Sequence, residues 1–396
     1  MKAEWQQGVL GDFVSAFIVP QRDKPKKFSG NIPWCRIEDI DGMWLSKSKS
    51  GKCVTDAMVQ EMPLRVFPTG TVMVSCSADL GRCAIASQPL ITNQTFIGLV
   101  PKPTLDPRFL YYLMSSKADA LNAAATGATI KYLSQEKFRL LPVTIPKLGE
   151  QQRIVGILGE AFEGIAKARA NAEKNLGNAH GVFRSYLEGV FSKQGEGWLE
   201  TTLGEIAVVK GGKRVPKGYK LSAVKTPFPY LRVADFGNDG SIDLAYLKYI
   251  DQRVHEQIKN YIIKKEDLYV SIAGTIGKAG IIPKELDGAH LTENACRLVF
   301  KPGILNHFIY FFTQTDSFVA QAGLNTRTSA QPKLALSRLS TIKLSVPNIG
   351  DQKKLLEKFG EIRSETLKLH NLYSKKIGEL ISLKMSVLND AFTGKL

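Results

Sequence analysis

The sequence predicts a mixed α/β fold in which two globular modules are separated by two long helices. Three observations support this prediction: an internal repeat that runs the length of the chain, short strand-like runs in each copy, and a long amphipathic helix closing each copy. With 396 residues, the chain is too long for one ordinary hydrophobic core.

The internal repeat is visible as similar stretches that occur twice in the same order. The clearest pair is IPKLGEQQRI (residues 145–154) and VPNIGDQKKL (346–355), and further matches lie on both sides of it. These matches are Trp5 with Trp198, PWCRIEDI (33–40) with PYLRVADF (229–236), Ser75 and Gly81 with Ser271 and Gly277, and Phe191 with Phe392. Agreement in this order along the whole chain indicates a duplicated unit.

Each copy begins with a strand-rich module. Short apolar or β-branched runs, bounded by Gly, Pro and Asn, are typical of strands. They are GTVMVSC, QTFIGLV and LPVTIP in the first copy and DLYVSIAG, ACRLVF and IKLSVP in the second. A helical segment interrupts each module, DPRFLYYLMSSKADALNAAA in one and NHFIYFFTQTDSFVAQAG in the other. Strands mixed with helices predict an α/β module.

Each copy ends in a long helix whose apolar residues follow alternating steps of three and four. The predicted seam is Ile154, Leu158, Ala161, Ile165, Ala168, Ala172, Ala179, Phe183, Leu187 and Val190 in the first helix, and Leu355, Phe359, Ile362, Thr366, Leu369, Tyr373, Leu380 and Val387 in the second. This spacing favours an antiparallel coiled coil with pseudo-twofold symmetry. The alternative is two helices that each pack on their own module.

The predicted boundaries are residues 1–147 for the first module, 148–194 for its helix, 195–348 for the second module and 349–396 for the second helix. Local chemistry explains the transitions. Pro146 and Pro347 end strands, since proline cannot donate to a sheet. Asp351 stands where the helix dipole favours an acid. The first helix is rich in glycine, which costs about 1 kcal/mol per residue relative to alanine. We expect small side chains there to admit a close partner helix.

The charge of the chain points to a polyanionic partner. Lys and Arg number 53 against 37 Asp and Glu, a net charge of +16, which favours nucleic acid binding over a merely solvated basic surface. We expect no membrane span, no signal peptide and, with five cysteines but no C-x-x-C pair, no metal cluster. A cytoplasmic location is the expectation.

Candidate nucleic-acid contacts occur where both copies become basic at the same place. PQRDKPKKF (20–28) and VVKGGKRVPKGYK (208–220) are predicted loops. Two polar loops before the last strand of each module add Lys131 and Arg327, and an arginine there can read guanine. Loop solvation is the alternative reading. The candidates are Arg22, Lys24, Lys26, Lys27, Lys131, Lys210, Lys213, Arg214, Lys217, Lys220 and Arg327. Arg36 and Arg232 occupy equivalent positions before a turn, where a DNA contact and a structural ion pair are equally consistent with the sequence.

Motifs for catalysis are absent from the sequence. GTIGKAG (274–280) lacks the P-loop spacing, and Lys278 is followed by Ala. The chain contains no G-x-G-x-x-G, H-E-x-x-H or N-P-P-[YFW] motif. His255, His290 and His307 stand alone in the sequence and favour structural roles. The sequence therefore predicts a protein that binds without a catalytic or metal site of its own.

The repeated apolar-Pro-x-x-Gly-acidic-Gln helix entry, together with LNDAFTGKL near the C-terminus and the P-x-x-R-[IV] stretches, resembles the specificity subunits of type I restriction–modification enzymes. The resemblance implies two target recognition domains that read the halves of a bipartite, asymmetric DNA site. It implies that the helices set the spacer and dock two methyltransferase subunits, to which restriction subunits attach. S-adenosylmethionine, ATP and Mg²⁺ would be bound by those partners, and this chain would hold no cofactor.

Three alternatives remain open from the sequence. The chain could serve a methylation-only or other phage-defence system without a nuclease partner. It could be a stand-alone nuclease with an unrecognised acidic site. It could also be a coiled-coil adaptor that binds only protein, although that reading leaves the repeated basic loops unexplained.

Overall fold

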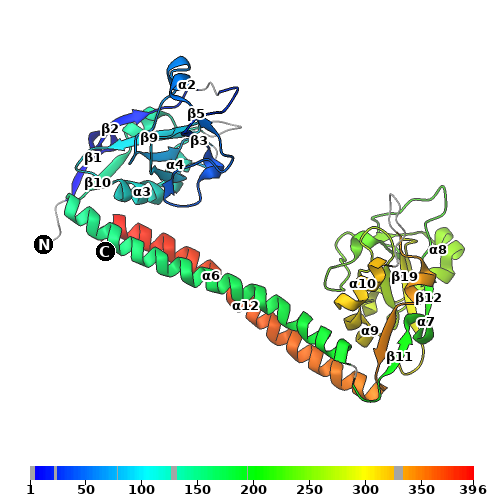
Figure 1. Ribbon diagram of the computed structural model, residues 1–396. Helices are drawn as coiled ribbons and strands as arrows, with labels where there is room; N and C mark the ends of the chain where they lie inside the picture. Colours follow the sequence, from blue (N-terminus) through cyan, green and yellow to red (C-terminus); the bar gives the residue numbers. More distant parts are fainter. Residues whose placement is uncertain (1–4, 22–24, 78, 126–131, 194, 325–332) are drawn as a thin grey trace. The chain divides into compact units, whose positions relative to one another are not determined.

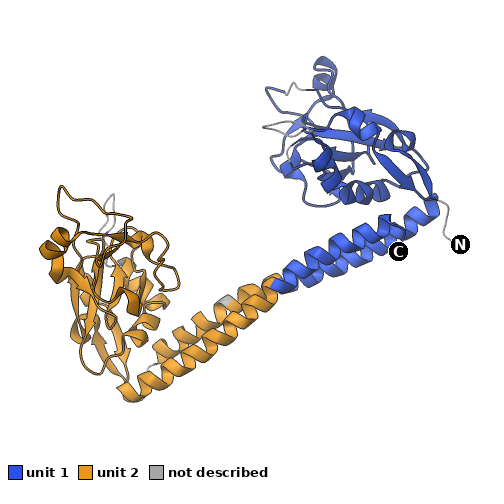
Figure 2. Cartoon of the chain, turned by 180° about the vertical axis from the view of Figure 1, so that it is seen from behind, with its two compact units in different colours: residues 1–172, 375–396 blue, residues 173–374 orange. Residues whose placement is uncertain are grey.

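The computed structural model describes residues 5–21, 25–77, 79–125, 132–193, 195–324 and 333–396. The chain divides into two compact units, one made of residues 1–172 and 375–396, the other of residues 173–374 (Figure 2). Each unit therefore combines one module with the beginning of one long helix and the end of the other.

Unit 1 contains a five-stranded sheet and a smaller three-stranded sheet. The five-stranded sheet has the order β2 (Val14–Ile18), β9 (Phe96–Pro101), β6 (Val72–Ser75), β7 (Cys83–Ala86) and β4 (Trp44–Leu45). The smaller sheet is β5 (Cys53–Val54), β3 (Ile32–Cys35) and β8 (Ile91–Thr92), and β1 (Gln6–Val9) pairs with β10 (Pro142–Ile145). The helices are α1 (Leu10–Phe13), α2 (Asp56–Glu61), α3 (Pro107–Ser116), α4 (Ala118–Ala124), α5 (Gln135–Arg139) and the 3₁₀ turn η1 (Ile37–Asp39).

Unit 2 repeats this plan. Its sheets are β12 (Ala207–Gly211), β19 (Ala295–Phe300), β16 (Leu268–Ser271) and β17 (Ala279–Ile281); β14 (Lys248–Tyr249), β13 (Pro229–Leu231), β18 (Ala289–Leu291) and β15 (Ile262–Ile263); and the pair β11 (Leu199–Thr202) and β20 (Lys343–Val346). Its helices are α7 (Leu203–Ile206), α8 (Gln252–Ile258), α9 (Asn306–Phe312), α10 (Asp316–Leu324) and α11 (Leu336–Ser340), with 3₁₀ turns η2 (Val233–Asp235), η3 (Lys259–Tyr261) and η4 (Lys284–Leu286). The mixed α/β fold and the internal repeat are confirmed.

The repeat extends to individual turns. After β6 the Gly81 amide donates to the Ser75 carbonyl at 3.2 Å, and after β16 the Gly277 amide donates to the Ser271 carbonyl at 2.9 Å. Gly81 and Gly277 have φ angles of +84° and +87°, a conformation that glycine adopts without a steric penalty. This stretch in unit 2 is therefore a strand-to-turn connection, as the failed P-loop spacing predicts.

The two long helices are α6 (Leu148–Lys193) and α12 (Ile349–Phe392), drawn with their labels in Figure 1. In unit 1 the first turns of α6 share a core with the last turns of α12, where Leu158 and Leu388 are both buried. In unit 2 the end of α6 meets the start of α12, and the rings of Tyr186 and Phe359 lie 6.0 Å apart. Because start meets end in both units, the antiparallel pairing is confirmed. No described helix is long and apolar enough to cross a bilayer.

The predicted seam is largely correct, with one exception and one wrong explanation. All its residues on α6 are buried or half-buried, whereas Leu369 on α12 is 40% exposed. The expectation that glycines admit a close partner helix is wrong, because a Cβ at any α6 glycine would meet no atom within 4 Å. Gly98 in β9 is the contrasting case, since a Cβ there would lie 2.2 Å from the Phe67 ring.

A buried glutamine fastens each long helix to its own module. The Gln151 side-chain amide donates to the carbonyls of Thr104 (2.9 Å) and Pro146 (2.8 Å), and its oxygen accepts from the Asp106 amide at 2.8 Å. Gln151 is fully buried. Its side chain therefore ties the first turn of α6 to the end of β10 and to the loop before α3.

The equivalent residue in unit 2 makes the same three bonds. Gln352 donates to the carbonyls of Gly303 and Pro347, both at 2.9 Å, and accepts from the Leu305 amide at 2.9 Å. It too has no exposed surface. A repeat of this hydrogen-bond pattern explains why Gln recurs in the two helix entrances.

The glutamine clasp predicts a large difference between neighbouring substitutions. Gln151→Leu leaves backbone groups without partners, each costing about 1–3 kcal/mol, so we expect a clear loss in the free energy of unfolding measured with urea. The matched control is Gln152→Leu, because Gln152 is exposed and its replacement should change stability little. Equal effects of the two substitutions would contradict the clasp.

Candidate nucleic-acid interface

The strand registers gather several loops at one end of each module, away from the long helices. In unit 1, Ile18 pairs with Gly98, and Ser75 pairs with Phe96. The loop after β2, the turn after β6 and the turn before β9 therefore lie together at that end. We call it the distal edge of unit 1, comprising residues 19–21, 25–27, 76–77, 79–82 and 93–95.

The distal edge of unit 2 is formed in the same way. Gly211 pairs with Cys296, and Ser271 pairs with Ala295, which brings together residues 212–220, 272–278 and 292–294. At the opposite end of the module, β11 lies beside the start of α12 (Figure 1). The basic segments predicted from the two copies thus occupy equivalent positions in the fold.

Most of the described candidate residues lie at these distal edges. Lys26, Lys27, Lys213, Arg214, Lys217 and Lys220 are exposed there. The prediction that residues 208–220 form a loop is wrong at Lys210, which lies within β12 and pairs with Arg297 of β19. Its side chain is nevertheless exposed. The strand extends further than predicted because Gly211 still fits the ladder with β19.

Four candidates, Arg22, Lys24, Lys131 and Arg327, lie outside the described residues. The first described residue after Lys131 is Tyr132, which bridges to Ser77, and the first after Arg327 is Lys333, which bridges to Ala273. These bridges place Tyr132 and Lys333 beside the turns that follow β6 and β16.

The basic side chains of the distal edges differ in how they are held. Lys26, Lys27, Lys217 and Lys220 form no ion pair with any described residue. Lys213 lies over the Tyr261 ring, 5.5 Å from its centroid, and Arg214 pairs with Glu293. Unpaired lysines are available to phosphates, while the two held side chains have defined positions.

Arg36 and Arg232 both form ion pairs, and of these two pairs the one at Arg232 has a buried carboxylate. The Arg232 amide donates to the Asp235 carboxylate at 2.7 Å, and its guanidinium Nε donates to the same oxygen at 3.0 Å. Asp235 is buried, so this pair stabilises the 3₁₀ turn η2. Arg36 pairs with Glu38 at 3.0 Å, and its amide donates to Asp39 at 2.7 Å. The sequence left this alternative open.

A buried and a half-buried histidine, His290 and His255, form a pair in unit 2. His255 Nδ1 and His290 Nε2 lie 2.9 Å apart, and the His255 ring stacks on Phe228 with centroids 4.1 Å apart. His290 has no exposed surface. Burial, helped by the neighbouring His255, lowers the pKa of His290 to about 4. The His290 ring is therefore neutral near pH 7, and the pair has a packing role.

Four of the five cysteines also behave as buried apolar groups. Burial raises the pKa of the Cys35, Cys83 and Cys296 thiols to about 12 and that of Cys76 to about 11. A thiol with such a pKa carries almost no thiolate and is a poor nucleophile and ligand. Within the described ranges, no group of three or more His, Cys, Asp or Glu side chains is placed to hold a metal ion.

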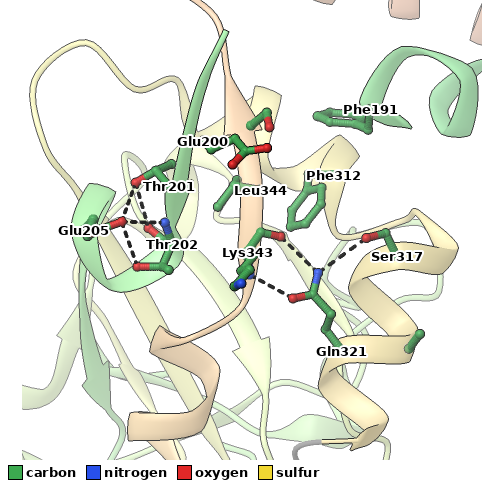
Figure 3. Close-up of a pocket in the computed structure, with 12 residues that line it drawn as sticks. Phe191, Glu200, Thr201, Thr202, Glu205, Phe312, Ser317, Gln321, Lys343 and Leu344 are labelled. Atoms are coloured by element: carbon green, nitrogen blue, oxygen red, sulfur yellow. Dashed lines mark hydrogen bonds between the residues drawn. The ribbon is translucent and has the colours of Figure 1, made fainter. Parts of the chain in front are cut away.

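A pocket in unit 2 lies between β11, β20, α10 and the end of α6 (Figure 3). The Glu205 carboxylate that borders it accepts hydrogen bonds from the Thr202 amide at 2.8 Å and from the Thr201 hydroxyl at 2.9 Å, which caps α7. Gln321 donates to the Lys343 carbonyl and accepts from its amide, so it pairs with the free edge of β20. These polar groups hold elements together, and the pocket lies away from the distal edge.

The histidine pair predicts a pH dependence confined to unit 2. Because the folded-state pKa of His290 lies below the unfolded value near 6.5, the unfolded chain binds more protons. Stability is therefore complete above about pH 6.5 and falls as the pH drops toward 4. The test is His290→Ile, which introduces the residue type found at the matching position of unit 1, Ile91. In this variant the free energy of unfolding, measured with urea, should vary less between pH 7 and 5. An unchanged pH slope would contradict this assignment.

The unpaired lysines predict a salt-sensitive contribution to DNA affinity. Replacing Lys217 and Lys220 with Gln, or Lys26 and Lys27 with Gln, should weaken binding to all duplex sequences alike. The slope of log K against log salt should shrink by about 0.9 for each phosphate that a lysine no longer neutralises. The control replaces Lys264 and Lys265, exposed at the opposite end of unit 2, and should leave the slope unchanged. An equal reduction in the control would show that charge alone, not its position, sets affinity.

Comparison with known proteins identifies the family of the two repeated units. The family model for the type I restriction modification DNA specificity domain matches twice, at residues 2–173 and 195–377. The MjaIX specificity subunit of Methanocaldococcus jannaschii is 27% identical over 252 residues, which cover 58% of this chain and 57% of that protein. The EcoBI specificity subunit of Escherichia coli is 22% identical over 370 residues, 84% of this chain and 74% of that protein.

The fold has a solved counterpart. The match is a chain from a solved structure that describes complex assembly and conformational transition of the type I R-M system. It superposes with a TM-score of 0.77 at 18% identity, and the match covers 99% of this chain and 98% of that chain. At this identity the likeness concerns the fold alone. Because the family model covers both modules and the first part of each long helix, the chain belongs to the type I restriction–modification DNA specificity family.

Proposed function

We propose that this chain is the specificity subunit that reads a bipartite, asymmetric DNA site for a type I restriction–modification complex. The observation that carries the proposal is the duplicated specificity domain, with exposed basic side chains at the same distal edge in both copies. Two readers of one fold but different side chains would read two unlike half-sites. The two basic segments show such a difference, with PQRDKPKKF (20–28) in unit 1 and VVKGGKRVPKGYK (208–220) in unit 2.

The long helices would set the number of base pairs left unread between the half-sites. The 46 residues of α6 rise about 69 Å at 1.5 Å per residue, compared with about 34 Å for one turn of B-DNA. The antiparallel pairing and the glutamine clasps support this role, because a ruler must be stiff and fixed at both ends.

The same helices would dock two methyltransferase subunits, through which restriction subunits attach. Leu367, Leu372, Ile381, Leu383 and Met385 on α12 are at least 46% exposed. At 100° per residue, Leu367, Ile381 and Met385 project to one side of the seam, and Leu372 and Leu383 to the other. Exposed apolar residues in such numbers are typical of an interaction surface. S-adenosylmethionine, ATP and Mg²⁺ would be bound by the partner subunits.

The test is selection of DNA from a random-sequence pool by the chain assembled with its methyltransferase subunits. We expect two short defined segments separated by a spacer of fixed length. Removing about one helical turn at matching positions of α6 and α12 should shorten the spacer and leave both half-sites unchanged.

Two results would contradict the proposal. Recovery of one contiguous motif, or of none, would exclude a bipartite reader. A change of the half-sites in the shortened variant, at constant spacer, would exclude the ruler.

A further inference from the structure

The ion pair between Arg214 and Glu293 differs from the Arg82–Asp79 pair of the distal edge of unit 1, whose carboxylate is 61% exposed. Arg214 follows β12, and Glu293 lies in the turn between β18 and β19. The Arg214 side chain is 77% exposed, whereas that of Glu293 is 25% exposed. An exposed arginine is thus held by a carboxylate that is itself largely covered.

The backbone that carries Arg214 is fixed at several points. The Gly212 amide donates to the Ala295 carbonyl at 2.9 Å, and the Lys213 amide donates to the Leu291 carbonyl at 2.8 Å. The Tyr230 hydroxyl donates to the Lys213 carbonyl at 2.8 Å, and Tyr230 is buried. The residues before Arg214 therefore have little freedom to move, although they lie in a surface loop.

Gly212 is required for this close approach. A Cβ at Gly212 would lie 2.1 Å from the Thr292 carbonyl oxygen and 2.3 Å from that of Leu291. No side chain could occupy that space without displacing the backbone of the turn. The glycine thus presses the Arg214 loop against the turn that contains Glu293.

The carboxylate leaves the end of the guanidinium free. Glu293 accepts from Arg214 Nε, and the Thr292 hydroxyl donates to the other Glu293 oxygen at 3.0 Å. Neither terminal nitrogen of Arg214 has a hydrogen-bond partner in the described part of the chain. Those two nitrogens are the groups that bind guanine O6 and N7 together.

We propose that Arg214 reads a guanine in the half-site recognised by unit 2 and that Glu293 is the residue that positions it. This inference rests on the proposed function. An arginine that is held in place before DNA binds loses less side-chain entropy on binding than a free one. Because its position is fixed, it cannot adjust to a displaced or different base, and binding such a base is less favourable. The nearby unpaired lysines, by contrast, supply affinity without sequence preference.

Arg214→Lys is the most direct test, since it keeps the charge but removes the planar, two-pronged donor. In selection with the methyltransferase subunits, we expect guanine preference to fall at one position of one half-site, by roughly 5- to 150-fold. The other half-site should be unchanged. Glu293→Gln should lower the guanine preference at the same position. Gln can still accept a hydrogen bond from Nε, but without a charge it holds the guanidinium less firmly.

Lys217→Gln is the matched control from the same loop and should lower affinity for all sequences without changing any position. A uniform loss of affinity with Arg214→Lys, like that of the control, would make Arg214 a phosphate contact and overturn the inference. An unaltered motif with Arg214→Lys would overturn it as well. If the unmodified chain selects no bipartite motif, the proposed function itself fails, so the two failures are distinguishable.

Discussion

The connection between module and helix depends on one buried side chain in each unit. Gln151 and Gln352 each satisfy two carbonyls and one amide where a strand ends and a long helix begins. An amide side chain suits this place because it offers donors and an acceptor together. A buried polar group is costly unless it is bonded, so the clasp is stable in only one arrangement. The direction of the helix relative to its own module is thereby fixed.

Aromatic packing completes the same junction with residues from distant parts of the chain. In unit 1 the Phe109 ring lies 6.4 Å from Trp5 and 5.2 Å from Phe392. In unit 2 the Phe308 ring lies 6.0 Å from Trp198 and 5.1 Å from Phe191. Each cluster joins the residue just before the first strand of a module, its internal helix and the end of the other long helix. A unit is therefore complete only when the two helices pair antiparallel.

Much of this architecture could be predicted from the sequence, because repetition and periodicity are properties that a single chain displays. The seam of α6 and the strand exits at Pro146 and Pro347 follow from local rules. The role of Gln151 could not be predicted, since its partners at Thr104 and Asp106 are distant in sequence. The recurrence of Gln in both helix entrances was the available signal. Likewise, the glycines of α6 suggested close packing, but only three-dimensional neighbours could show that nothing approaches them.

Under the proposed function, the distal edges divide affinity and discrimination between different side chains, which composition alone does not reveal. A count of Lys and Arg treats Lys217 and Arg214 as equal, although one is unpaired and the other is held by Glu293. Unpaired lysines lower the free energy of the complex with any DNA sequence, target or not, so they cannot discriminate between sequences. Discrimination needs a donor whose position is decided before the base arrives, and a nearby carboxylate provides that at the cost of some net attraction for DNA. A site with excess positive charge can bear this cost, which is why a glutamate at a basic edge is compatible with DNA recognition.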